Sequence, residues 1–145
     1  MQAHFANLIA EIARANDVPL AVEDGLCCFQ YRDIEMILEV PVGGVLAIFH
    51  ASLPLDEESI AAERLLAMNL DRLTSSPSFF GYDKIGNAAV FCRVVPLANL
   101  NADDLFAEIL AFTQEAKDVA DEISEPKSDQ VSKADFAQTE LWIRG

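Results

Sequence analysis

The chain has 145 residues, the size of one ordinary domain, and 52% of them are hydrophobic while 23% are charged, which predicts a packed core and excludes a disordered chain. Its 10 Lys and Arg residues against 24 Asp and Glu residues give a net charge of −14, which argues against partners that need a basic surface, such as nucleic acids and anionic membranes. The longest uncharged stretches, such as residues 40–52, are far shorter than the roughly 20 apolar residues that span a bilayer, and the first residues lack the pattern of a signal peptide, so we expect a cytoplasmic protein.

The first part of the chain predicts one helix followed by three strands. Residues 3–15 carry apolar side chains at helical spacing, and this helix is expected to end before Pro19. Three segments rich in strand-forming residues follow, at residues 26–31, 34–40 and 45–53. The connections between them are too short for parallel crossovers, so the three strands are predicted to pair antiparallel.

Residues 61–73 predict a second helix, with Asp56 as its N-cap and with Leu55 and Ile60 as a hydrophobic staple. Its apolar residues form two rows, Ala61, Leu65 and Met68 in one and Ala62, Leu66, Leu70 and Leu73 in the other. A helix that packs on a single surface needs an apolar stripe only about 100° wide. We therefore expect this helix to contact two surfaces, its own sheet and something else, which is the first indication of an oligomer.

The rest of the chain predicts a hairpin and a long third helix. Residues 78–86 and 88–96 form the expected hairpin, with its turn about Gly86 and Asn87, and Asn101 is the expected N-cap of the helix. The element order α-β-β-β-α-β-β-α predicts a single α+β domain over residues 1–123, with three helices and an antiparallel sheet of about five strands. Residues 124–145 are expected to form a polar C-terminal tail, flexible or docked through its few apolar side chains.

Side chains that could carry chemistry are few. The chain has two histidines, His4 and His50, and three cysteines, Cys27, Cys28 and Cys92. No Cys or His spacing typical of zinc and no glycine-rich phosphate-binding motif is present, so we expect no catalytic residue, no metal and no cofactor. One alternative is a small thiol enzyme in which His50 activates one of the three cysteines.

The predicted elements carry more apolar surface than one copy of so small a domain can bury. Ile37, Leu46 and Ile48 lie on the sheet face opposite Met36 and Leu38. Exposed apolar patches with an acidic rim are typical of protein-binding sites. The alternative is that the first helix covers one face of the sheet and the third helix covers the other.

These segments, in this order, resemble the bacterial type III secretion chaperones of the Tir chaperone (CesT) family. Residues 20–31 are similar to the family's opening, a hydrophobic segment, an Asp-Gly pair and a strand, and residues 34–41 to the strand that follows. Residues 63–70, with a paired Leu and then Asn-Leu, are similar to its second helix, and residues 79–105 to its final hairpin and capped last helix. The resemblance covers about residues 3–123 and includes the small size and the acidic pI.

The resemblance implies a small, acidic, cytoplasmic homodimer without enzymatic activity. It would bind the N-terminal chaperone-binding segment of a secreted effector in extended form, keeping the effector stable and competent for secretion. The implied dimer interface is built around the second helix, and its candidate residues are Leu65, Leu66, Met68, Asn69, Leu70 and Leu73. Some of these must pack on the protomer's own sheet.

Effector binding of the implied kind combines strand addition at an open sheet edge with apolar grooves beside the first helix and the sheet. The candidate effector-binding residues, each of them also a candidate for the core, are Phe5, Leu8, Ile12, Phe29, Ile37, Leu46 and Ile48. Two further alternatives stay open. One is a regulatory binding protein of the same fold that sequesters a regulator or another chaperone, and the other is a ligand-binding α+β module with a closed apolar pocket.

Overall fold

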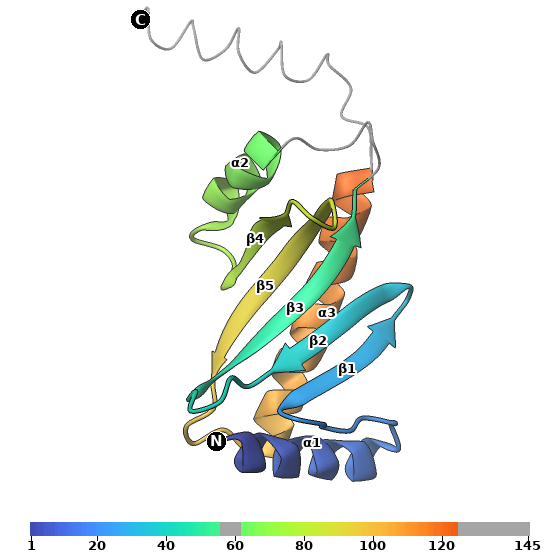
Figure 1. The fold of residues 1–145 in the computed structure, drawn as a ribbon, viewed down its shortest axis with the longest axis vertical. Helices are drawn as coiled ribbons and strands as arrows, with labels where there is room; N and C mark the ends of the chain where they lie inside the picture. Colours follow the sequence, from blue (N-terminus) through green and yellow to red (C-terminus); the bar gives the residue numbers. More distant parts are fainter. Residues whose placement is uncertain (56–61, 125–145) are drawn as a thin grey trace, which may run out of the picture.

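The structure of the protein, a computed structural model, describes residues 1–55 and 62–124 (Figure 1). Its elements in chain order are α1 (Gln2–Asn16), β1 (Leu26–Tyr31), β2 (Ile34–Glu39), β3 (Leu46–Pro54), α2 (Ala62–Arg72), β4 (Ser78–Asp83), β5 (Ala88–Pro96) and α3 (Ala102–Ser124). The predicted element order is confirmed. The expected cap and staple residues of α2, Asp56 and Ile60, and the expected tail beyond Ser124 lie outside the described residues.

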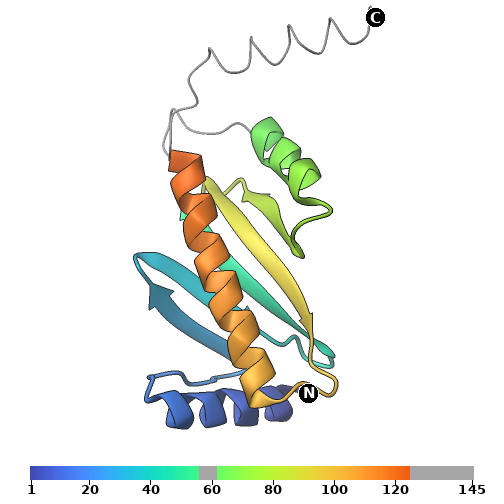
Figure 2. The same ribbon diagram turned by 180° about the vertical axis from the view of Figure 1, so that it is seen from behind.

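The five strands form one antiparallel sheet in the order β1-β2-β3-β5-β4. β1 and β4 are therefore the edge strands, and β5 lies between β3 and β4. Seen from behind, α3 runs diagonally across the sheet and α1 crosses its lower end (Figure 2). Side chains of α1 and α3 share one buried cluster with the sheet, so the alternative in which these two helices cover opposite faces is wrong.

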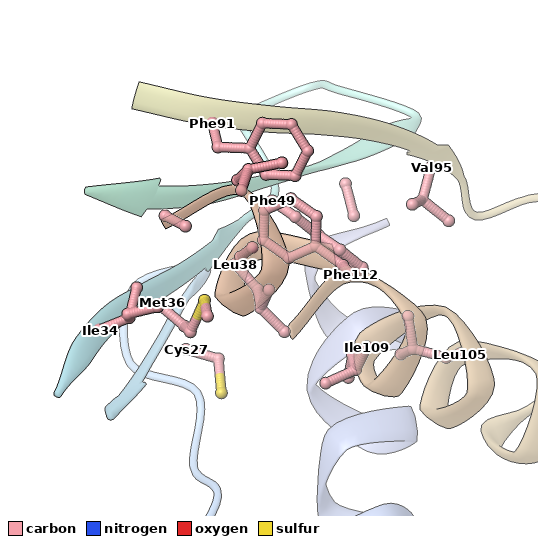
Figure 3. Packing of buried hydrophobic residues seen from close by; sticks show 14 of the residues in the cluster. Cys27, Ile34, Met36, Leu38, Phe49, Phe91, Val95, Leu105, Ile109 and Phe112 are labelled. Carbon is pink, nitrogen blue, oxygen red and sulfur yellow. The ribbon is translucent and has the colours of Figure 1, made fainter. Parts of the chain in front are cut away.

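Strict alternation along the strands directs one set of side chains into this core. Along β2, Ile34, Met36 and Leu38 are buried, whereas Ile37 between them is only half-buried, as expected for a strand with one covered face. In the centre of the core the ring of Phe112 from α3 stacks on Phe91 of β5, with 5.6 Å between the ring centroids (Figure 3).

The opposite face of the sheet, called the open face below, carries a row of side chains that crosses all five strands. The strand registers align Cys28, Ile37, His50, Cys92 and Phe79 in that row. Ile48 and Leu46 of β3 belong to the same face. In the described part of the chain, α1 and α3 both lie on the other side of the sheet (Figures 1 and 2).

Gly25 permits the turn that begins β1. Asp24 and Gly25 have φ angles of 52° and 80°, in the left-handed region that glycine adopts without strain. A side chain at Gly25 would also collide with the amide group of Gln2, whose Nε2 donates a hydrogen bond to the carbonyl oxygen of Val40 at 2.8 Å. The Asp-Gly pair thus ties the start of β1 to the end of β2 and to the first turn of α1.

The connection between β4 and β5 is longer than predicted. β4 ends at Asp83 and not at residue 86, because Asp83 Oδ1 accepts a hydrogen bond from the backbone N–H of Ile85 at 3.0 Å and starts a turn there. The connection is therefore longer than the expected turn about Gly86 and Asn87.

Candidate protein-binding surfaces

The two predicted apolar rows of α2 have different environments. Leu65 and Met68 are buried against the protomer. Leu66, Leu70 and Leu73 project outward and are 67%, 72% and 74% exposed. We call these three residues the leucine ridge. A contiguous apolar ridge at helical spacing is typical of a surface that another protein covers.

Asn69 connects α2 to the edge of the sheet. Its Nδ2 donates a hydrogen bond to the carbonyl oxygen of Phe80 at 2.9 Å, and the backbone N–H of Phe80 donates to Asn69 Oδ1 at 2.6 Å. The side-chain amide thus pairs with β4 as a neighbouring strand would. Leu65, Met68 and Asn69 were expected at a dimer interface, and the structure instead turns them toward their own protomer, because they lie on the helix face that meets β4.

Arg93 is a buried cation that the sequence interpretation missed. It lies on the core face of β5, is 6% exposed, and donates hydrogen bonds to Ser78 Oγ at 2.9 Å, to Glu108 Oε2 at 2.9 Å and to Glu115 Oε2 at 2.5 Å. The alternation of β5 places Arg93 between the buried Phe91 and Val95. That alternation was the available signal that this arginine points inward.

Glu115 of α3 accepts hydrogen bonds from four donors, which lie in α2, in the α2–β4 connection, in β4 and in β5. Its carboxylate accepts hydrogen bonds from Arg72 at the end of α2, from Ser76, from Ser78 at the start of β4, and from Arg93. Burial acts to raise the pKa of Glu115, but the hydrogen bonds donated by Ser76, Arg72, Ser78 and Arg93 outweigh it and hold that pKa below its ordinary value. We call this group of side chains, with Glu108, the Glu115 network.

An apolar groove of about 280 Å³ runs beside the edge strand β1. Its walls come from the α1–β1 connection, from β1 and from α3, and they include Val18, Leu20, Phe29, Tyr31, Phe106 and Leu110. Leu110 is 51% exposed and forms part of the outer wall. Phe106 and Leu110 form a second apolar row on α3, spaced four residues apart, which the sequence interpretation did not use.

The seven candidate effector-binding residues fall into three environments. Phe5, Leu8 and Ile12 are buried in the protomer core, because the apolar face of α1 packs against the sheet and α3, so they do not line an open groove. Phe29 lines the apolar groove. Ile37, Leu46 and Ile48 lie on the open face, half-buried or exposed.

His50 has neighbours that the thiol-enzyme alternative would require. The register of β3 and β5 pairs His50 with Cys92, and its Nδ1 lies 3.8 Å from Cys92 Sγ. Its Nε2 lies 3.4 Å from Glu39 Oε1. Burial raises the pKa of Cys92, however, and burial together with the neighbouring Cys28 raises the pKa of Cys27 to about 11. Both effects favour the protonated thiol, which is the unreactive form.

Within residues 1–55 and 62–124, His, Cys, Asp and Glu side chains do not gather in any group of three or more that could hold a metal ion. In the same residues no helix combines the length and the hydrophobicity needed to cross a bilayer.

Comparisons with known proteins address the family directly. The sequence model of the Tir chaperone protein (CesT) family matches residues 7–120. A chain of the HopA1-SchA chaperone-effector complex shares the fold with a TM-score of 0.68 at 18% identity, over 80% of this chain and 92% of that one. A chain of the ExsC-ExsE complex gives a TM-score of 0.73 at 13% identity, over 85% and 96% of the two chains.

A third similar structure is that of the Yersinia pestis type III secretion chaperone SycH in complex with a stable fragment of YscM2. Its TM-score is 0.62 at 12% identity, over 83% of this chain and 99% of that one. No curated protein matches this chain in sequence. At these identities the solved structures establish the fold, and the match to the family model over most of the chain establishes the family. The resemblance found in the sequence is thus confirmed, and the chain belongs to the Tir chaperone protein (CesT) family, which is a family of chaperones and not of enzymes.

Proposed function

We propose that this protein is a cytoplasmic type III secretion chaperone. As a homodimer it binds the N-terminal chaperone-binding segment of a secreted effector in extended form, stabilises the effector and keeps it competent for secretion. Family membership supports this proposal, as does the fold that the chain shares with chains of chaperone-effector complexes.

The observation that carries the proposal is the apolar groove beside the edge strand β1. An extended client segment that pairs with β1 gains main-chain hydrogen bonds without a strict sequence requirement. Its side chains alternate between two sides. One set faces the groove near Phe29 and Tyr31, and the other set faces the open face near Cys28 and Gln30. A client bound here therefore contacts both surfaces at once.

The other edge of the sheet is less suited to a client strand. Phe80 of β4 already uses its backbone N–H and carbonyl groups in the two hydrogen bonds with Asn69. A client strand at β4 would have to displace this amide and move α2. At β1 the backbone N–H and carbonyl of Leu26 are already bonded to Glu23 at 2.9 Å, so we propose that a client strand pairs with the rest of β1, residues 27–31.

Charge favours a basic client segment. The chain carries a net charge of −14, and Glu35 and Glu39 flank Ile37 on the open face of β2. Complementary charge accelerates the encounter of two proteins and favours the correct partner. Ordering an extended segment is costly, so useful affinity requires contact over a large area, which the groove and the open face together supply.

The leucine ridge supports the homodimer. Two copies related by a two-fold axis would pack their ridges against each other, so that the same residues are buried on both sides. Leu66, Leu70 and Leu73 are then the interface residues that we propose. The buried Leu65 and Met68 support the ridge from within the protomer.

Replacing Leu110 by aspartate is expected to weaken client binding by about tenfold or more, because burial of a leucine side chain is worth about 1.5–3 kcal/mol. Leu110 is half exposed in the free protein, so thermal unfolding should change little. The measurement begins with co-expression and affinity capture in the native bacterium, with mass spectrometry of the bound proteins. The N-terminal segment of the secreted client is then titrated by calorimetry.

The matched control is Ile85→Asp, which introduces the same charge at a fully exposed apolar residue of the β4–β5 hairpin. Equal affinity of the Leu110→Asp variant and the wild type for the client segment would contradict the groove as the binding site. Capture of a regulator or of another chaperone in place of a secreted protein would support the regulatory alternative.

We also propose that the protein catalyses no reaction. The raised pKa of Cys92 opposes its use as a nucleophile next to His50. Replacing Cys92, the cysteine next to His50, by serine should therefore leave the affinity for the client segment unchanged within error, as measured by the same titration. A loss of client binding in the Cys92→Ser variant that still folds, judged by circular dichroism, would show that the Cys92 thiol takes part in the function and would reopen the thiol-enzyme alternative.

A further inference from the structure

The position of α2 depends strongly on polar contacts. Its described part, Ala62–Arg72, has 11 residues, of which Leu65 and Met68 are buried. Helices of this length are unstable alone in water, so contacts with the rest of the fold must hold them. α2 lies at one end of the sheet, beside β4 (Figure 1). Besides the burial of Leu65 and Met68, its polar side chains reach the rest of the described protein through the Asn69 pairing with β4, through Arg72 and through one long hydrogen bond from Arg64.

Arg72 links the last turn of α2 to the Glu115 network. Its guanidinium group donates to Glu115 and lies 5.6 Å from the centre of the Phe91 ring. Both members of this ion pair are largely shielded from water, with side chains 22% and 18% exposed. A hydrogen-bonded ion pair with little solvent around it is stronger and better defined in geometry than a surface pair.

Glu115 is itself held in place from the opposite side. Arg93 binds the same carboxylate, and Arg93 is fixed in turn by Ser78 and Glu108. The carboxylate that receives Arg72 therefore cannot follow α2 if the helix moves. The network joins the end of α2 to the core face of the sheet and to α3.

We propose that Arg72 is a positioning residue for the dimer interface. Held by Glu115, which Arg93 fixes in turn, it sets the rotation of α2 about its own axis. This inference rests on the homodimer put forward under Proposed function. Each residue along a helix turns the direction of the side chain by about 100°, so a modest rotation of α2 moves the leucine ridge away from the two-fold axis. In a two-fold interface the same rotation occurs in both protomers, so the leucine ridges of both copies are displaced.

Asn69 cannot provide this control by itself. Its two hydrogen bonds join α2 to a single residue, Phe80. The buried Leu65 and Met68 add contacts that are apolar and without direction, so they fix the rotation of α2 less closely than a second polar contact does. Arg72, one turn further along, binds Glu115 of α3 and so adds a short, directed polar contact to a different layer of the fold.

The test is the variant Arg72→Met, which removes the attachment while keeping an apolar stem of similar length over Phe91 and leaving the Arg93–Glu115 pair in place. The dimer dissociation constant, measured by sedimentation equilibrium, is expected to rise by about tenfold or more, within the range of coupling energies of charged networks. Amide hydrogen exchange should accelerate in α2 and not in the core strands. Arg72→Lys, which keeps the charge but not the planar fork, should restore part of the affinity.

The matched control is Arg64→Met, the same change on the same helix at an arginine that, within residues 1–55 and 62–124, makes one long hydrogen bond of 3.5 Å, to the carbonyl oxygen of Glu122. If the Arg72→Met variant has the dimer dissociation constant and the α2 exchange rates of the wild type, the inference is wrong and the proposed dimer still stands. A wild-type protein that stays monomeric at all concentrations would overturn the dimer itself, and the inference with it.

Discussion

Replacing Arg93 by methionine should lower the free energy of unfolding by about 3 kcal/mol, a large share of the 5–15 kcal/mol that holds a typical domain together. The methionine can fill the space of the arginine stem, but it leaves Glu115, whose side chain is 18% exposed, with only Arg72 as a charged partner. Ser78 also loses the donor that orients its hydroxyl group. Urea denaturation followed by circular dichroism measures the change.

The matched control is Lys117→Met on α3, the helix that carries Glu115. Lys117 forms an i,i+4 ion pair with Asp121, whose side chain is 59% exposed to solvent, against 18% for Glu115. Such pairs contribute about 0.5 kcal/mol or less, so the control should unfold at nearly the wild-type urea concentration. If the Arg93 and Lys117 variants lose the same small amount of stability, the buried network does not stabilise the fold as described.

The double substitution Leu66→Glu with Leu70→Glu is expected to convert the dimer to a monomer, with a dissociation constant at least about 100-fold higher. Two leucines from each protomer leave the interface, each worth about 1.5–3 kcal/mol when buried, and four carboxylates of like charge would face one another across the two-fold axis. Both leucines are more than two-thirds exposed in the protomer, so the fold should survive. Sedimentation equilibrium measures the dissociation constant, and the circular dichroism spectrum shows whether the fold is retained.

A control with the same added charge is Val42→Glu with Ile85→Glu, at two loop residues that are 92% and 100% exposed. This control should remain dimeric. An unchanged dimer in the Leu66 and Leu70 variant would show that α2 is not the interface and would direct attention to the exposed Phe79 and Val94.

The elements of this fold were predictable because their signals are local. Alternation in β2 and helical spacing in α3 depend only on neighbours in sequence, and the structure has both. The same patterns do not reveal what covers an apolar face. Phe5, Leu8 and Ile12 have the spacing of a helix face that packs on something, and that spacing is the same whether the covering surface is the protomer's own core or a client.

The polar contacts were not predictable for a different reason. Asn69 pairs with Phe80, and Arg93 with Glu115, only because β5 inserts between β3 and β4 and brings α2, β4 and α3 together. No spacing in the sequence encodes that strand order. The order also decides which apolar row of α2 faces inward, so the leucine ridge could be separated from Leu65 and Met68 only in the folded chain.

The amide of Asn69 also has a consequence for solubility. A β-sheet with two unprotected borders can grow by stacking copies side by side, which is the route to ribbons and fibrils. Here one border is occupied at Phe80 by the protein's own side chain. Sheet-to-sheet polymerisation needs a free edge on both sides of each copy. A protein with one edge blocked can therefore offer the other edge to a client without polymerising.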